Sequence, residues 1–259
     1  MHVDAYIARA FAEVQGHCGF KPDVKRAINR VLQRPTERDF NALRYYLSAD
    51  DAAYVDIGAN RGNTVRAARL FQPNMPIVAF EPNPILVPAL QKMFAGDRAI
   101  VVEPYGLSDQ PGTFELFVPH YKTAPFDGLA SLHYAEVESS LNCENLWGFD
   151  PRHFEVRTLH CNVRRLDDFR LRTGFLKIDV QGSEAKVIAG GYETIERDKP
   201  IVLMENNRPE VDAKLLFDLG YERYAFVSNR LVRGRLGDLN SFYIHPRRRT
   251  AFAAQIYAD

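Results

Sequence analysis

Short apolar runs alternate with amphipathic segments along most of the chain. "AYVDIG", "PIVAFEP" and "AIVVEPYGL" are apolar over consecutive positions, whereas "TVRAARLF" and "ILVPALQKMF" space their apolar residues as a helix does. Strands that are buried on both faces produce continuous apolar runs, and alternation with helices is typical of a parallel sheet. The pattern therefore predicts an α/β fold with a doubly wound, mostly parallel sheet.

The two ends of the chain and one internal stretch depart from this rhythm. Residues 1–50 have a helical pattern and are predicted as an N-terminal extension to a main domain over residues 51–259. "RYAFVS" and "SFYIHP" predict an antiparallel hairpin that closes the sheet. Residues 110–160 begin with a strand-like run, "GTFELFVP", and then lose all periodicity. We interpret this insertion as a substrate-facing lid, because long excursions are often functional; a surface insertion without function is the alternative.

The composition excludes several classes of protein. The 259 residues are 46% hydrophobic, and 33 basic residues balance 33 acidic ones. A neutral chain does not gather polyanions, so nucleic acid is an unlikely partner. The three cysteines are far apart, so a zinc site or a disulfide framework is not indicated. No apolar run is long enough to span a membrane, and we expect a cytoplasmic protein.

A glycine turn follows the first predicted strand, in "YVDIGANRGNT". The dinucleotide fingerprint needs glycines two and five residues after Gly58, yet Asn60 and Asn63 occupy those positions. The second glycine normally lets a pyrophosphate approach the backbone. The remaining pattern of Asp56, Gly58, Asn60 and Gly62 combines a tight turn with an acid and an amide. This combination favours a cationic or zwitterionic ligand over a diphosphate.

Two further acids end predicted strands of the same sheet. Glu81 follows Gly58 by 23 residues, where an acid is placed to accept hydrogen bonds from ribose hydroxyls. Asp179 ends the strand in "LKIDVQGSE", although it is also suited to cap the next helix. Ligands in such sheets bind at the carboxyl ends of strands, so Asp56, Glu81 and Asp179 should converge. A ribose acceptor without a pyrophosphate cradle predicts S-adenosylmethionine as the cofactor.

With these motifs in place, the chain resembles the FkbM family of S-adenosylmethionine-dependent methyltransferases. The matching segments occur in the family's order over roughly residues 52–207: "YVDIGANRGNT", "VAFEPNP", "YGLSDQPG", "LDDF", "LKIDVQGSEAKVIAGG" and "PIVLMEN". The resemblance implies a class I methyltransferase fold, which is Rossmann-like. It also implies methyl transfer to a hydroxyl oxygen of a sugar, lipid or natural product.

The resemblance also implies roles for individual residues. The glycine-turn residues would line the aminoacyl end of the cofactor, and Glu81, with Pro82 beside it, would hold the ribose. The residues expected near the adenine are Leu107, Ser108 and Asp109. One position departs from the family, because Gln181 stands where most members have glutamate.

Methyl transfer to a hydroxyl requires removal of its proton. Asp179 is our first candidate for the general base, because it lies at the strand end nearest the expected acceptor. Lys177 is expected to orient the acceptor or to stabilise charge. His133, in the predicted lid, is the alternative base, although a lone loop histidine is more often structural.

A magnesium ion is a further hypothesis at this edge of the sheet. Glu205 and Asn206 end the strand that follows the one bearing Asp179. Three oxygen ligands together with water suit Mg²⁺, and such an ion would lower the pKa of a bound hydroxyl. The alternative is that Glu205 and Asn206 contact the substrate or cap the strand end.

The sequence therefore predicts an O-methyltransferase acting on a small hydroxyl acceptor. A catalytically degenerate methyltransferase fold that only binds partners, and an RNA methyltransferase, are the alternatives. An NAD-dependent or nucleotide-sugar enzyme is disfavoured by the absent glycines. No sequence motif identifies the acceptor. For the oligomeric state, a homodimer is our hypothesis.

Overall fold

A computed structural model describes residues 35, 37–47, 52–126, 129–142, 146 and 149–258. The chain divides into two compact units. One unit comprises Glu37–Phe114 and His160–Asp259, and the other comprises Met1–Thr36 and Glu115–Leu159. The first unit contains the large sheet and is called the sheet unit below.

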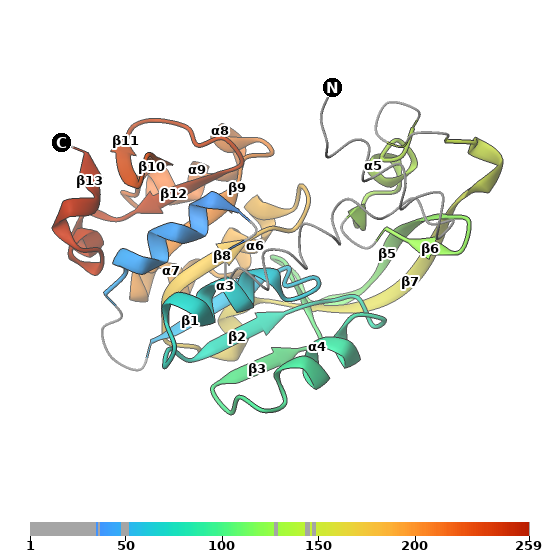
Figure 1. Cartoon of the computed structure of the whole chain (residues 1–259), viewed down its shortest axis with the longest axis horizontal. Helices are drawn as coiled ribbons and strands as arrows, with labels where there is room; N and C mark the ends of the chain where they lie inside the picture. The colour runs from blue at the N-terminus through green and yellow to red at the C-terminus, as the bar shows by residue number, and fades with distance from the viewer. Residues whose placement is uncertain are drawn as a thin grey trace, which may run out of the picture. The chain divides into compact units, whose positions relative to one another are not determined.

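A nine-stranded sheet forms the centre of the sheet unit (Figure 1). Its strands lie in the order β13-β11-β10-β12-β9-β8-β1-β2-β3. In chain order, their bounds are β1 Ala53–Ile57, β2 Ile77–Phe80, β3 Ile100–Glu103, β8 Thr173–Ile178, β9 Ile201–Glu205, β10 Glu222–Val227, β11 Arg230–Arg233, β12 Asn240–Ile244 and β13 Tyr257–Ala258.

The strand directions identify the fold class. Strands β3, β2, β1, β8 and β9 pair in parallel, whereas β12 is antiparallel to both β9 and β10. The chain winds outward in both directions from the boundary between β1 and β8, which is the switch point of a doubly wound sheet. This is the arrangement of a class I methyltransferase, so the predicted fold class is confirmed. The predicted pairing of the two closing strands is present, with the unpredicted β11 inserted between them in the chain.

Helices cover both faces of the sheet. Buried residues of η1 (Arg38–Tyr45), α3 (Asn63–Phe71) and α4 (Val87–Phe94) share one hydrophobic core with Tyr54 and Phe175. Buried residues of α6 (Glu184–Gly190), α7 (Tyr192–Asp198) and α9 (Lys214–Asp218) share a second core with Val55 and Leu176. Neighbouring strand residues thus enter opposite cores, which explains the continuous apolar runs.

The remaining strands belong to a smaller sheet of order β4-β7-β5-β6. The strand predicted from "GTFELFVP" is present as β5 (Gly112–Tyr121), with β4 at Gly106–Leu107 and β6 at Ala124–Pro125. The sequence did not predict β7 (Phe154–Arg164) or α5 (Tyr134–Glu138). Most of β7 is exposed or half-buried, so its sequence carries polar residues that hide a strand period. The lid role of residues 110–160 stays a prediction.

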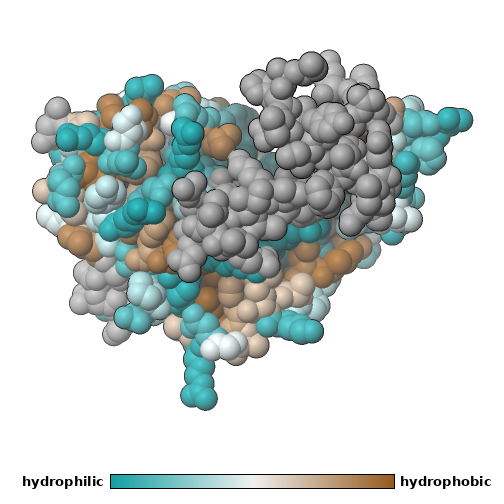
Figure 2. All heavy atoms as spheres, viewed as in Figure 1, coloured by the Kyte–Doolittle hydropathy of each residue, from teal (hydrophilic) through white to brown (hydrophobic). Residues whose placement is uncertain are grey.

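The remaining elements are short. They are η3 Pro151–His153, η4 Leu166–Phe169, α8 Pro209–Asp212, η5 Pro246–Ala251 and η6 Ala254–Ile256. Hydrophilic and hydrophobic residues are interspersed over the visible part of the sheet unit (Figure 2). None of the helices in the described ranges is both long and apolar enough to cross a membrane.

Candidate active site

The glycine turn between β1 and α3 adopts a backbone that few residue types tolerate. Gly58, Asn60 and Gly62 have φ angles of 84°, 47° and 74°. Glycine adopts such left-handed angles without strain, and asparagine does so more readily than most residues. A Cβ on Gly58 would lie 1.9 Å from the backbone oxygen of Asp179. The turn therefore needs glycine here because the ends of β1 and β8 approach so closely.

Glu81 holds the glycine turn in place. Its Oε2 accepts a hydrogen bond from the backbone N–H of Asn60 at 2.6 Å, and its Oε1 accepts one from that of Asn83 at 2.8 Å. Glu81 therefore lies directly against the glycine turn. A carboxylate oxygen can accept more than one hydrogen bond, which suits Glu81 to a position beside a ribose.

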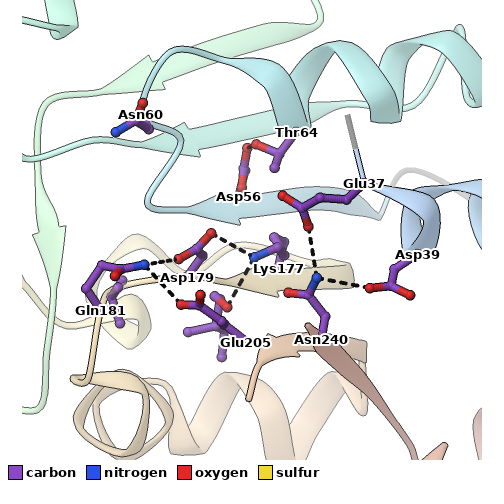
Figure 3. A network of polar contacts seen from close by, with 12 residues as sticks. Glu37, Asp39, Asp56, Asn60, Thr64, Lys177, Asp179, Gln181, Glu205 and Asn240 are labelled. Carbon is purple, nitrogen blue, oxygen red and sulfur yellow. Dashed lines mark hydrogen bonds and ion pairs between the residues drawn. The ribbon is translucent and has the colours of Figure 1, made fainter. Parts of the chain in front are cut away.

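The strand register sets polar side chains on one face of the sheet. Asp56 pairs with Lys177 across β1 and β8, and Lys177 pairs with Leu203 of β9. Since side chains two residues apart share a face, Glu205, two residues after Leu203, is on this face as well. Asp179 follows Lys177 by two residues at the end of β8. In Figure 3 these side chains lie together at the carboxyl ends of the strands.

Lys177 is the cation at the centre of this cluster. Its side chain is fully buried, and its Nζ lies 3.3 Å from Oδ2 of Asp179, whose side chain is 30% exposed. Burial alone would lower the pKa of Lys177, but the carboxylates of Asp179, Glu37, Asp56 and Glu205 raise it above its ordinary value. Lys177 is therefore charged at neutral pH and cannot act as a base.

Asp56 is a fully buried carboxyl group beside the glycine turn. Its Oδ2 accepts a hydrogen bond from the hydroxyl of Thr64, whereas its buried Oδ1 has no hydrogen-bond partner among the described residues. Burial raises the pKa of Asp56 to about 6, and the negative charges of Asp179 and Glu37 contribute to the rise. A buried acceptor without a donor is costly, so a ligand that donates to Oδ1 would be favoured.

Gln181 joins the carboxyl groups of Asp179 and Glu205 (Figure 3). Its Nε2 donates to Oδ1 of Asp179 at 2.9 Å and to Oε2 of Glu205 at 3.0 Å. Burial and the charge of Asp179 raise the pKa of Glu205 to about 7. Burial also tends to raise the pKa of Asp179, but Lys177 and hydrogen bonds hold it below its usual value. The two carboxyl groups thus differ strongly in base strength.

Sequence reasoning missed a second group of residues behind Lys177. Nδ2 of Asn240 donates to Glu37 at 2.8 Å and to Asp39 at 3.1 Å. Asn240 pairs with Glu205 across β12 and β9, so the register brings it to this face. About 200 residues separate Asn240 from its two partners. No local motif marks such a contact, and only the complete sheet order reveals it.

The model of the FkbM methyltransferase domain matches residues 56–226, which is more than half of the chain. The chain belongs to the FkbM methyltransferase family.

Individual relatives are distant. The chain is 28% identical over 165 residues to the 2-O-methyltransferase NoeI of Sinorhizobium fredii (strain NBRC 101917 / NGR234). That match covers 59% of this chain and 63% of NoeI, less than two thirds of the relative.

Two solved structures are similar at lower identity. Methyltransferase FkbM from Methylobacillus flagellatus KT is 17% identical, with a TM-score of 0.47 and coverage of 76% of this chain and 44% of that one. The precorrin-6y C5,15-methyltransferase from Geobacter metallireducens GS-15 is 12% identical, with a TM-score of 0.38 and coverage of 79% and 85%.

The residues expected near the adenine lie beside the Glu81 strand end of this FkbM domain. A Cβ on Gly106 would lie 3.3 Å from Cβ of Pro82, so β4 approaches the segment after β2. Leu107 and Ser108 are buried, and Asp109 is exposed. The hydroxyl of Ser108 donates to Asp109 at 3.0 Å. The role of this segment in holding the adenine stays a prediction.

His133 lies in the other compact unit. It occupies the N-cap position of α5 and is exposed, and its backbone N–H donates to the hydroxyl of Ser131 at 3.1 Å. Its role as an alternative base stays a prediction.

The predicted magnesium ligands do not present a suitable donor set. Asp179 and Glu205 direct oxygens at the N–H groups of Gln181. Asn206 donates through Nδ2 to the oxygen of Gly237, and its Oδ1 is buried with no hydrogen-bond partner among the described residues, so Asn206 offers at most one oxygen. Mg²⁺ requires close oxygen ligands in near-octahedral geometry, and an amide N–H is not a ligand. Within the described part of the chain, no three acidic, histidine or cysteine residues are grouped to hold a metal. We therefore derive no step through a metal ion.

Proposed function

We propose that this protein transfers a methyl group from S-adenosylmethionine to a hydroxyl oxygen of a sugar, lipid or other natural product. The observation that carries the proposal is the surplus of carboxyl groups around one ammonium. Asp56, Asp179 and Glu205 lie with Lys177 at the carboxyl ends of three adjacent strands. A cationic cofactor offsets this surplus, whereas a dinucleotide diphosphate would add to it.

The cofactor when bound supplies a methyl group already activated by the positive sulfur. Asp56 has a buried oxygen with no partner, which suits the amino group of an aminoacyl tail. Gly58, Asn60 and Gly62 would line that tail. Glu81 would hold the ribose hydroxyls, and Leu107, Ser108 and Asp109 would flank the adenine.

The acceptor hydroxyl must lose its proton to a nearby base. The Asp179 side chain is partly exposed and is fixed by Lys177, which suits it to position the hydroxyl. Glu205 is the stronger base of the pair, because its pKa is raised to about 7 whereas that of Asp179 is lowered. We therefore assign removal of the acceptor's hydroxyl proton to Asp179 and Glu205 together, whereas the sequence led us to expect Asp179 alone. The name of NoeI, a 2-O-methyltransferase, supports an oxygen acceptor.

Calorimetry with S-adenosylmethionine, its demethylated product and NAD tests the cofactor. We expect the first two to bind and NAD to bind little. Glu81→Ala should weaken binding by about 1–3 kcal/mol, the usual cost of leaving buried polar groups without partners. Glu81→Gln should lie between Glu81→Ala and wild type, and Glu196→Ala on the exposed face of α7 is the matched control. Tight binding of NAD alone would refute the proposal.

Turnover of an acceptor found by screening glycosides, lipids and alcohols tests the base. Asp179→Asn and Glu205→Gln should each lower turnover by on the order of 10²–10⁴ while cofactor binding is kept. Full activity in both variants would move proton removal to His133 or to solvent.

A further inference from the structure

The amide of Gln181 occupies the space between two carboxyl groups. One nitrogen directs its two hydrogens at Asp179 and Glu205, at 2.9 and 3.0 Å. The orientation follows from the partners, because a rotated amide would bring its carbonyl oxygen against two carboxyl groups. Gln181 thus supplies donors to both acids, which also share a direct hydrogen bond that raises the pKa of Glu205 and lowers that of Asp179.

The backbone around Gln181 is held in an unusual conformation. Gln181 has a φ of 51°, which most residues avoid, and Gly182 follows it with a φ of 92°. The buried Glu184 accepts from the backbone N–H groups of Val180 and Gly182, at 3.4 and 3.2 Å. Arg208 donates to the oxygen of Gly182 at 2.7 Å. The turn is therefore fixed from several sides, and it aims the Gln181 side chain at the pair.

Among the neighbouring amide and ammonium groups, Gln181 is positioned to contact both Asp179 and Glu205. Lys177 lies beside Oδ2 of Asp179, and Asn207 donates to Oε2 of Glu205 at 3.1 Å. Lys177 and Asn207 thus each contact one of the two acids, whereas Gln181 contacts both. In sites built of carboxylates, this bridging position is the one that a divalent cation takes.

We propose that Gln181 takes the place of a divalent cation between Asp179 and Glu205, so that the pair is held together by an amide and a hydrogen bond between the two acids, and not by a metal. The carboxyl groups keep their geometry without a third acid. The proposal concerns the local geometry of the pair, so it holds or fails independently of methyl transfer.

Binding of Mn²⁺ to the full-length protein tests the proposal, by electron paramagnetic resonance and calorimetry. Wild type should bind Mn²⁺ only weakly. Gln181→Glu should bind it at least tenfold more tightly, because a third carboxylate replaces the N–H donors with oxygen ligands. Gln91→Glu, on the exposed surface of α4, adds the same charge elsewhere and should behave as wild type. Gln181→Glu combined with Glu205→Gln should lose the gain.

Two results would overturn the proposal. One is stoichiometric, micromolar binding of Mn²⁺ by wild type at a site that is lost in Glu205→Gln. The other is a folded Gln181→Glu variant that binds Mn²⁺ no better than Gln91→Glu. If Gln181→Glu does not fold, Gln181→Asp carries the same expectation and is judged by the same comparison. Calorimetry with S-adenosylmethionine on the same samples reports separately on the proposed methyl transfer.

Discussion

Asp56 shows how one buried carboxyl group links stability to ligand binding. Its pKa is raised to about 6 from an ordinary value of 3.8, first by burial. Below about pH 4 the group is protonated in both the folded and the unfolded chain. Between about pH 4 and pH 6 the unfolded chain has released this proton while the folded chain still holds it. The stability present at low pH is therefore lost as the pH rises through the folded pKa of about 6. The folded protein therefore bears the cost of an ionised, partly unsatisfied acid at neutral pH.

We expect Asp56→Asn to remove this pH dependence. Between about pH 4 and 7.5 the free energy of unfolding of wild type should fall relative to the variant, by about 3 kcal/mol for a shift of roughly two pKa units. Urea titrations across this range measure the difference. Asp218→Asn, at an exposed position of α9, should keep the wild-type dependence. Parallel curves for wild type and Asp56→Asn would show that Asp56 ionises normally in the folded state.

The glycine turn illustrates what can be predicted at the level of elements. β1 and α3, the turn between them and the Glu81 strand end were all evident from the sequence, because each leaves a local pattern of apolar runs and glycines. The contact between Gly58 and the backbone of Asp179 left no such pattern, since it joins residues more than a hundred positions apart. The contact between Asn240 and Glu37 is equally distant in the chain and left no pattern either. Strand β7 was missed for another reason, since its many exposed polar residues hide the strand period.

Three glycine variants separate steric contact from backbone strain. Gly58→Ala introduces both, because φ is 84° and the new Cβ would lie 1.9 Å from Asp179. Gly234→Ala has a φ of 73° with open space around it, and Gly96→Ala has open space and no positive φ. We expect Gly58→Ala to destabilise by several kcal/mol, Gly234→Ala by about 1 kcal/mol and Gly96→Ala hardly at all. Melting temperatures from thermal unfolding rank the three variants by stability. Equal destabilisation by Gly58→Ala and Gly234→Ala would mean that the ends of β1 and β8 move apart at little cost.

The numbers of acidic and basic residues in the chain are equal, but acidic side chains are concentrated around Lys177. The formal net charge is zero, yet Glu37, Asp56, Asp179 and Glu205 all act on the buried ammonium of Lys177. Composition alone predicted only that no polyanion would be attracted, because it does not report where charges lie. The uneven placement comes from strand order, which brings together residues from the beginning, middle and end of the chain. Such a cluster disfavours folding, and an organic cation that enters it without needing oxygen ligands would offset part of that cost.

We therefore expect the protein to be stabilised more by the positively charged sulfonium of S-adenosylmethionine than by the neutral sulfur of its demethylated product. At the same saturating concentration of either ligand, the melting temperature should rise further with the sulfonium ligand, because it alone adds a positive charge near the carboxyl groups and should therefore bind more tightly. Glu37→Gln removes one negative charge without altering a proposed cofactor contact, and it should narrow the difference between the two ligands. Glu196→Gln, which removes an exposed charge from α7, should leave the difference unchanged. Equal shifts for both ligands in wild type would show that the carboxyl cluster does not act on the sulfur, and recognition would then rest on the aminoacyl and ribose groups alone.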